Sequence, residues 1–380
     1  MEDLIYLDYN ATTPVDEAVV DAMLPYFRSV YANGGSSHLF GQIVKEAIEE
    51  AGEKIAELIS ADLKEIIYTS GATEAVNLAL KGIEKVNGKN HIITVRTEHK
   101  AVLDTCIDLE KRGFVVTHLD VGNDGLIDLD ELTNAIFEET LLVCVMLVNN
   151  ETGVVQPIQD IAKIAHDKDC LVFCDTTQAV GKIPVDVKDL GVDLMAFSAH
   201  KFYGPKGIGA LYVSSELKKK ITAQIHGGGQ QFNLRSGTLN VPGITGMGKA
   251  AEIALEDMQT DAITIRELRD YLENSLLEIP NTSLNGHKDT RIFNTSNVCF
   301  SDINSEKIIL SLGNISVSSG SACNATTSRP SHVLKAMGMS DLAALSSIRF
   351  SLGKFTTKSE IEMTIQKIKK IVIRLRQENQ

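Results

Sequence analysis

The sequence predicts an α/β protein with a large unit built on a mostly parallel sheet, followed by a smaller α+β unit. Between about residues 15 and 255, short apolar runs typical of buried strands alternate with segments of helical periodicity. Such alternation is typical of a parallel sheet covered by helices on both faces. After a long helical stretch over about 246–279, the alternation stops. We therefore expect two domains, with residues 15–255 forming the large one and residues 1–14 and 256–380 forming the small one.

Seven apolar runs predict the strands of the large unit. In chain order they are EIIYTSG (65–71), HIITV (91–95), FVVTHL (114–119), LLVCVMLV (141–148), CLVFCD (170–175), DLMAFSAH (193–200) and GALYV (209–213). Helical periodicity separates several of them, over 74–86, 101–113 and 158–168.

In the smaller unit, NTSNVCF (294–300) and SIRFSLG (347–353) predict strands, and the chain ends in a helix. Thr357 and Glu360 have the spacing of a capping box at the start of that helix. Its apolar face is formed by Ile361, Ile365, Ile368, Val372 and Leu375.

The composition is that of an ordinary globular protein of 380 residues, with 43% hydrophobic and 23% charged residues. A net charge of −13 argues against non-specific binding to nucleic acid or to an anionic membrane. The longest apolar run, residues 141–148, is far too short to span a bilayer, and the first ten residues lack the order of a signal peptide. We therefore expect a soluble, cytoplasmic protein that binds neither membrane nor nucleic acid directly.

The cysteines predict neither a disulfide framework nor a metal site, because they are sparse and form no Cys-x-x-Cys pair. Cys323 differs from the rest, since it lies in SVSSGSACNATTSR (316–329), whose small residues cannot form a core around a thiol. The cysteines that lie among apolar residues, and that we expect to be inert core, are Cys106, Cys144, Cys170, Cys174 and Cys299.

The segment TSGATEA (69–75) follows a predicted strand and begins a predicted helix. Ligands of open α/β sheets bind beyond the carboxyl ends of the strands, so such segments are the first candidates for a site. Gly71 allows a tight turn, and the free amide groups at a helix start favour an anion. Taken alone, the segment leaves an anion site and an ordinary helix cap equally open.

Asp175 and Lys201 follow two successive apolar strands. Lysine is seldom buried unless it is paired or functional, and a buried lysine can act as an amine nucleophile. With a phosphate-type turn nearby, this pair indicates pyridoxal phosphate, with Lys201 bound covalently to the cofactor and Asp175 at the ring nitrogen. The alternative is a structural ion pair between the two side chains.

The stretch GITGMGKA (243–250) matches part of a nucleotide-binding P-loop. Ala250 stands where a P-loop needs Ser or Thr to hold magnesium, and no hydrophobic strand precedes the stretch. We interpret it as close packing at a helix start, which argues against a nucleotide-binding enzyme.

Together these segments resemble the cysteine desulfurases of the NifS-like, iron–sulfur-cluster-assembly type, within the class V pyridoxal-phosphate-dependent aminotransferases. The resemblance covers essentially the whole chain. It rests on YLDYNATTP (6–14), TSGATEA (69–75), TEHKAV (97–102), VNNETGVVQP (148–157), DTTQAVGKIPVDV (175–187), SAHKFYGPKGIGALYV (198–213), RSGTLNV (235–241), SSGSAC (318–323) and SSIRFSLG (346–353).

The resemblance implies the fold type I of aminotransferases, with a mostly parallel seven-stranded sheet in the large domain. It also implies conversion of L-cysteine to L-alanine, with transfer of the sulfur to Cys323 as a persulfide. Asn150 and Arg349 would hold the substrate carboxylate, to which the planar fork of an arginine is suited.

The resemblance further implies pyridoxal 5'-phosphate as the cofactor. Lys201 would form the Schiff base, Asp175 would pair with the ring nitrogen, Gln178 would bind the ring hydroxyl oxygen, and His99 would stack on the ring and handle protons. The remaining cofactor-binding residues would be Ala72, Thr73, Ser198, His200 and, from the other subunit of an obligate homodimer, Thr238.

The sequence departs from the family pattern at Gly34, where proline is usual, and at Thr176, where alanine is usual. The composition after Cys323 also differs, so the sulfur acceptor stays open between an iron–sulfur scaffold and a thiolation enzyme for tRNA, DNA or another cofactor. Selenocysteine lyases and other pyridoxal-phosphate enzymes of the same fold are the alternative functions. A silent sulfur- or cluster-binding scaffold is the alternative outside enzymes.

Overall fold

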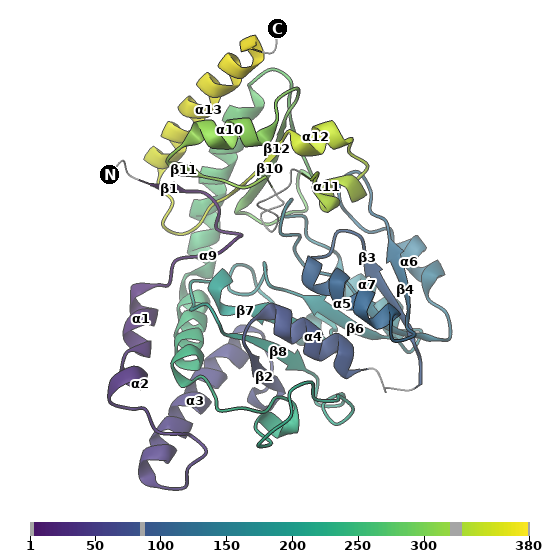
Figure 1. Ribbon diagram of the computed structural model, residues 1–380, viewed down its shortest axis with the longest axis vertical. Coiled ribbons are helices and arrows are strands. Elements are labelled where there is room, and N and C mark those ends of the chain that lie inside the picture. Colours follow the sequence, from purple (N-terminus) through teal and green to yellow (C-terminus); the bar gives the residue numbers. More distant parts are fainter. Residues whose placement is uncertain (1–3, 84–87, 320–328, 379–380) are drawn as a thin grey trace.

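The computed structural model describes residues 4–83, 88–319 and 329–378. Its largest element is a seven-stranded sheet in the order β2-β8-β7-β6-β5-β3-β4 (Figure 1). Strands β3 to β7 pair in parallel, and β8 is antiparallel to both β7 and β2. The predicted mostly parallel seven-stranded sheet is confirmed. Its strands are β2 (Ile66–Thr69), β3 (His91–Val95), β4 (Val115–Leu119), β5 (Thr140–Cys144), β6 (Leu171–Asp175), β7 (Leu194–Ser198) and β8 (Gly209–Val213).

Both faces of this sheet are buried, because apolar residues fill successive positions of its strands. In β6, Val172 and Cys174 belong to one hydrophobic cluster, whereas Phe173 belongs to the cluster on the opposite face. The helices α4 (Ala72–Gly82) and α5 (Lys100–Glu110) cover the face of Phe173. The opposite face is covered by α3 (Leu39–Leu58), α7 (Ile158–His166) and α9 (Val241–Leu277).

Helix α9 begins earlier than the predicted range of 246–279. Pro242 lies in its first turn, and the side chain of Asn240 accepts a hydrogen bond from the amide of Gly243. Gly248 contacts Ala51 of α3 so closely that a Cβ atom would lie 2.6 Å from the Cα of Ala51. The glycine-rich stretch 243–250 is therefore helical and closely packed, as predicted. The predicted boundary at residue 255 lies within α9, and the division into two domains stays a prediction.

The smaller unit contains an antiparallel sheet in the order β12-β10-β9 and a two-stranded parallel pair of β1 with β11. The predicted capping box is present in its last helix, since the amide of Glu360 donates to Thr357 Oγ1 and that of Thr357 to Glu360 Oε2. The strands and helices of the smaller unit are β1 (Ile5–Tyr6), β9 (Thr282–Leu284), β10 (Thr295–Phe300), β11 (Ile315–Ser316), β12 (Ser347–Ser351), α10 (Ser305–Leu312), α11 (His332–Ala336), α12 (Asp341–Leu345) and α13 (Lys358–Glu378).

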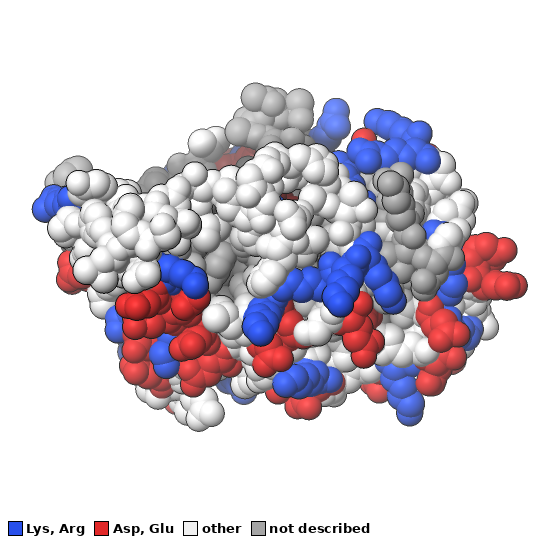
Figure 2. Space-filling model, turned by 90° about the horizontal axis from the view of Figure 1, so that it is seen from below, with Lys and Arg blue, Asp and Glu red and all other residues white. Residues whose placement is uncertain are grey.

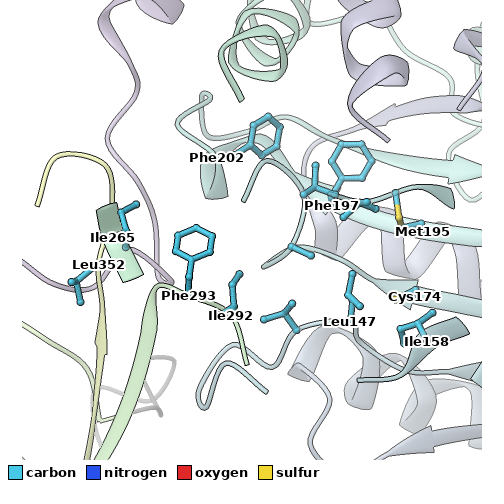
Figure 3. Close-up of a cluster of buried hydrophobic side chains, with 14 of the residues drawn as sticks. Leu147, Ile158, Cys174, Met195, Phe197, Phe202, Ile265, Ile292, Phe293 and Leu352 are labelled. Atoms are coloured by element: carbon cyan, nitrogen blue, oxygen red, sulfur yellow. The ribbon is translucent and has the colours of Figure 1, made fainter. Parts of the chain in front are cut away.

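One hydrophobic cluster joins the two units. Figure 3 shows Met195 and Phe197 of β7 on one side and Phe293 and Leu352, which flank the small sheet, on the other. This shared core fixes the position of the small sheet relative to the large sheet. The other helices are α1 (Glu17–Met23), α2 (Pro25–Arg28), α6 (Leu129–Ala135) and α8 (Val187–Leu190), with short 3₁₀ turns at Leu63–Glu65, Ala199–Lys201 and Gln231–Asn233.

The cysteines expected in the core, Cys106, Cys144, Cys170, Cys174 and Cys299, are indeed buried as free thiols. Within the ranges given above, no helix combines the length and the apolar character that crossing a membrane requires.

Candidate active site

A cavity of about 730 Å³ opens at the carboxyl edge of the large sheet. Because β2, β3, β5, β6 and β7 run in the same direction, the segments that follow them meet at this edge. Thr238 is exposed and does not line the cavity, and Cys323 lies outside the described residues. The other predicted site residues all line it: Ala72, Thr73, His99, Asn150, Asp175, Gln178, Ser198, His200, Lys201 and Arg349.

The turn between β2 and α4 forms one end of the cavity. Gly71 caps the helix with a φ of +153°, a conformation that side-chain-bearing residues rarely adopt. Gly209 of β8 lies against it, and a Cβ atom on Gly209 would lie 2.7 Å from the Cα of Gly71. The first amide groups of α4, which have no acceptor within the helix, can bind an anion. The turn and the first residues of α4 line the cavity, which is the placement that an anion site requires.

Lys201 lies in the short 3₁₀ turn that follows β7, and it lines the cavity. Its Nζ atom donates hydrogen bonds to the backbone carbonyls of Asn10 (2.6 Å) and Ala11 (2.7 Å). Asp175, which ends β6, is buried, and its carboxylate accepts a hydrogen bond from the amide of Thr177 (2.9 Å). Two neighbouring strands thus deliver an amine and a carboxylate to the same cavity.

Gln178 is fixed on both sides of its amide group. Its Nε2 atom donates to the carbonyl of Asn10 (2.9 Å), and its Oε1 atom accepts from Lys182 Nζ (2.7 Å). Both Gln178 and Lys182 are buried. Burial, together with the positive charges of Lys201 and Arg349, holds the pKa of Lys182 well below its usual value.

Arg349 of β12 brings the small sheet to the cavity. Its Nη1 atom donates to the carbonyl of Asn150 (2.8 Å), and its Nη2 atom donates to the carboxylate of Asp8 (2.6 Å). Within the described ranges, the buried atoms Arg349 Nε and Asn150 Oδ1 have no hydrogen-bond partner. Because an unpaired buried polar atom is costly, these atoms indicate a polar ligand next to them.

Three histidines line the cavity, namely His99, His200 and His332. His99 caps α5, and its Nδ1 atom accepts a hydrogen bond from the amide of Ala101 (3.1 Å), so a neutral His99 carries its proton on Nε2. Burial and the neighbouring Lys201 lower the pKa of His200 to about 4, so His200 is neutral near pH 7.

Two glutamates near the cavity are buried. Burial, and then the charge of Asp175, raise the pKa of Glu98 well above its usual value. Burial raises the pKa of Glu151 to about 7, against the opposing effects of Ser331 and Arg349. Glu151 lines the cavity, and its carboxylate accepts a hydrogen bond from Ser331 Oγ (2.5 Å).

Four residues without a role predicted from the sequence also support or line the cavity, namely Asn10, Glu151, Lys182 and Ser331. Asn10 lies in a segment that the resemblance already contained, and Glu151 follows Asn150 directly. Ser331 precedes a helix, and its hydroxyl caps α11. Lys182 also lies in a segment of the resemblance, DTTQAVGKIPVDV (175–187), but nothing in that segment distinguishes it from a surface lysine.

The comparisons with known proteins agree with one another. The family model for class-V aminotransferases matches residues 5–363. The chain is 50% identical to a cysteine desulfurase IscS from Glaesserella parasuis, covering 98% of this chain and 94% of that protein. It is 48% identical to a cysteine desulfurase IscS from Rickettsia massiliae, covering 98% and 92%.

Solved structures show the same relationship. A NifS-like protein superposes with a TM-score of 0.91 at 38% identity, over 97% of this chain and 99% of that one. SspA in complex with cysteine superposes with a TM-score of 0.82 at 38% identity, over 93% and 100%. Because the family model and the curated relatives both match over nearly the full length, the chain belongs to the class-V aminotransferase family and, within it, to the cysteine desulfurases.

Proposed function

We propose that this protein is a cysteine desulfurase that converts L-cysteine to L-alanine and passes the sulfur through Cys323 to an acceptor. The observation that carries the proposal is the cavity itself. It combines an anion-binding helix start, an amine, a carboxylate and an arginine, which are the groups that a pyridoxal-phosphate enzyme of amino acids requires.

The residues of the cavity fit pyridoxal 5'-phosphate. The start of α4, with Ala72 and Thr73, suits a phosphate, and a Cβ atom on Gly71 would lie 3.5 Å from Ser198 Oγ, so the hydroxyl lies close to the same turn. Thr177 Oγ1 is a further buried atom without a hydrogen-bond partner among the described residues. A neutral His200 and the buried carboxylate of Asp175 complete a polar lining.

When bound, pyridoxal phosphate links covalently to amines and withdraws electrons from the bonds of the substrate. Ala72, Thr73, Ser198 and His200 would hold its phosphate. Asp175 would hold the ring nitrogen, Gln178 the ring hydroxyl oxygen, and His99 the ring face, while Lys201 would provide the covalent attachment.

The chain's own groups then bind the substrate and handle its protons. Arg349 would hold the carboxylate of L-cysteine, since its buried Nε atom is a donor without a partner among the described residues. Asn150 would donate to the same carboxylate through its side-chain nitrogen. The Lys201 amine would take up the proton from the α-carbon. His99 would move protons through Nε2, because its Nδ1 atom is engaged by the helix start.

Sulfur transfer balances without an external oxidant. The thiolate of Cys323 would form a bond to the substrate sulfur as the bond between that sulfur and Cβ breaks. The carbon fragment takes up protons and leaves as L-alanine, and Cys323 keeps the sulfur as a persulfide. L-cysteine and the enzyme thiol thus become L-alanine and the enzyme persulfide.

We also propose an obligate homodimer in which Thr238 completes the cavity of the other subunit. The exposure of Thr238 supports this, since its own cavity does not contain it. Arg235, in the same segment, is ion-paired with Glu74 at the start of α4 (2.7 Å), so the segment is anchored next to the anion site. Seen from the end where α2 and the start of α3 lie, part of the surface carries no charged side chain (Figure 2). Between the start of α1 and the first turns of α3, the exposed apolar residues are Val20, Leu24, Phe27, Tyr31, Leu39 and Ile43.

The acceptor of the sulfur would be an iron–sulfur scaffold protein or a thiolation enzyme. A cytoplasmic location is supported by the free thiols of the buried cysteines, which persist in a reducing compartment.

The proposed function is tested by adding pyridoxal phosphate and then L-cysteine to the purified protein. We expect visible absorption from the bound cofactor, followed by equimolar alanine and sulfide when a reductant is present. A colourless protein that forms no alanine would refute the proposal.

A further inference from the structure

Lys182 is a buried amine to which the proposed chemistry assigns no role. It lies in the turn between β6 and α8 and is only 8% exposed. The described charges that act on it, Lys201 and Arg349, are both positive, and the acceptor for its Nζ atom is the neutral amide oxygen of Gln178. Burying an amine in such surroundings lowers the stability of the folded protein. Its presence therefore indicates a role other than stability.

The turn that carries Lys182 is held rigidly behind the cavity. Gly181 has a φ of +74°, and an ideal Cβ atom there would lie 2.4 Å from the Cβ of Phe202, the residue that follows Lys201. The amide of Lys182 donates to the carbonyl of Ala179 (2.9 Å). Lys182 itself does not line the main cavity, whereas Gln178 does. Its amine therefore reaches the Gln178 side chain from the side away from the cavity.

The two hydrogen bonds determine which way the Gln178 amide points. The backbone carbonyl of Asn10 can only accept, so the atom of Gln178 that lies 2.9 Å from it must be the nitrogen. The oxygen of the amide then lies on the other side, where it accepts a hydrogen bond from the amine of Lys182 (2.7 Å). The carbonyl of Asn10 and the amine of Lys182 favour the same orientation of the amide, so removal of either one weakens the preference for it. The second N–H of Gln178 is then the polar group available to a ligand.

We propose that Lys182 is a positioning residue for the cofactor, because it orients the Gln178 amide so that an N–H group, and not the carbonyl oxygen, faces the ring hydroxyl oxygen of pyridoxal phosphate. The inference rests on the proposed function. A flipped amide would set its oxygen against the oxygen of the ring, which removes a hydrogen bond and adds a repulsion. Lys182 acts through Gln178 and does not touch the cofactor.

The test is a double-mutant cycle on the full-length protein, with the dissociation constant of pyridoxal phosphate and the visible absorption maximum of the holoenzyme as readouts. We expect Lys182→Met to weaken cofactor binding about tenfold, as the loss of one hydrogen bond would, and to shift the absorption maximum. In a Gln178→Ala background, Lys182→Met should change neither quantity. Lys182→Arg, which keeps a donor, should restore part of the affinity. The matched control is Lys188→Met, which removes an exposed lysine six positions along the chain and should behave as wild type.

The unfolding temperature of the cofactor-free protein separates positioning from a structural role. Removing a buried amine should leave that temperature unchanged or raise it, although cofactor binding weakens. Equal affinity in wild type and Lys182→Met, or an equal loss in the Gln178→Ala background, would overturn the inference. If the wild-type protein itself binds no pyridoxal phosphate, the proposed function fails instead, so the two failures are distinguishable.

Discussion

The hydroxyl group of Ser331 donates a 2.5 Å hydrogen bond to the buried carboxylate of Glu151. This contact joins the first turn of α11 to the segment that carries Asn150, so it connects two walls of the cavity. The neighbouring His332 adds a second connection, since its Nε2 atom lies 2.9 Å from the carbonyl of Glu98. The position of α11 at the cavity is therefore set by two polar contacts with residues that follow β3 and β5.

Glu151 makes the stability of the protein depend on pH. Its pKa rises from the ordinary 4.5 to about 7 on folding, so the folded state binds more protons than the unfolded state between these values. The contribution of Glu151 is fully present below pH 4.5 and is lost as the pH rises through 7. We expect wild type to lose about 3 kcal/mol of unfolding free energy relative to Glu151→Gln across this range. Urea unfolding of both proteins from pH 4.5 to 8 measures the difference.

Ser331→Ala provides the matched variant. In wild type the hydrogen bond from Ser331 favours the ionised form of Glu151, and the variant removes this bond. The pKa of Glu151 should then rise further, and the decline in stability should extend to higher pH. A difference between wild type and Glu151→Gln that stays constant with pH would contradict this account.

Gly209 is required where β8 passes the turn between β2 and α4. A Cβ atom there would lie 2.5 Å from the carbonyl oxygen of Phe197 and 2.7 Å from the Cα of Gly71. Both are backbone atoms, so a rotamer change cannot relieve the clash. We expect Gly209→Ala to cost about 1–3 kcal/mol of unfolding free energy and to weaken cofactor binding. Gly35→Ala is the control, since its closest contact would be the side-chain oxygen of Asn33 at 3.3 Å. Equal stability of the two variants would show that the turn tolerates a side chain.

Lys201→Ala should abolish alanine formation while the fold survives. The variant lacks the amine that would attach the cofactor, but the start of α4 and Asp175, which line the same cavity, would still bind it. Circular dichroism checks the fold, and the absorption spectrum should show cofactor that is bound without the covalent link. Turnover at the wild-type rate would rule out the role of Lys201.

The shared site of the proposed homodimer is tested by mixing chains. A heterodimer of Lys201→Ala and Thr238→Ala chains has one doubly damaged site and one intact site, provided that Thr238 acts across the interface. We expect activity to return after the chains exchange, although each parent homodimer is impaired. Native mass spectrometry verifies that the chains have exchanged. If activity does not return after verified exchange, Thr238 does not serve the other subunit.

Much of the fold could be predicted from the sequence, because each element has a local signal. The apolar runs marked the strands, and the spacing of Thr357 and Glu360 marked the start of α13. The run 141–148 was predicted as one strand, but β5 ends at Cys144. Val145 and Leu147 still donate hydrogen bonds to the carbonyls of Phe173 and Asp175, so the chain stays beside β6 until it turns at Asn149. Hydrophobicity alone does not locate such a turn.

The candidate site was predictable where its residues directly follow strands, as Asp175 and Lys201 do, because strand ends meet at one edge of the sheet. The support behind it was not predictable. Asn10 reaches Gln178 across 168 residues of chain, and Ser331 reaches Glu151 across 180. Such contacts depend on how the two units pack together, and no local pattern encodes them.

Mass spectrometry of the protein after incubation with L-cysteine and no reductant shows whether Cys323 receives the sulfur of L-cysteine. We predict a gain of one sulfur atom on the peptide that contains Cys323. Cys323→Ser should gain no sulfur, because a serine hydroxyl is a poor nucleophile at neutral pH. This variant should keep its cofactor absorption. The buried cysteines, whose thiols do not reach solvent, should stay unmodified. Added sulfur on Cys106 or Cys299 in place of Cys323, or alanine formation by Cys323→Ser at the wild-type rate, would contradict the account.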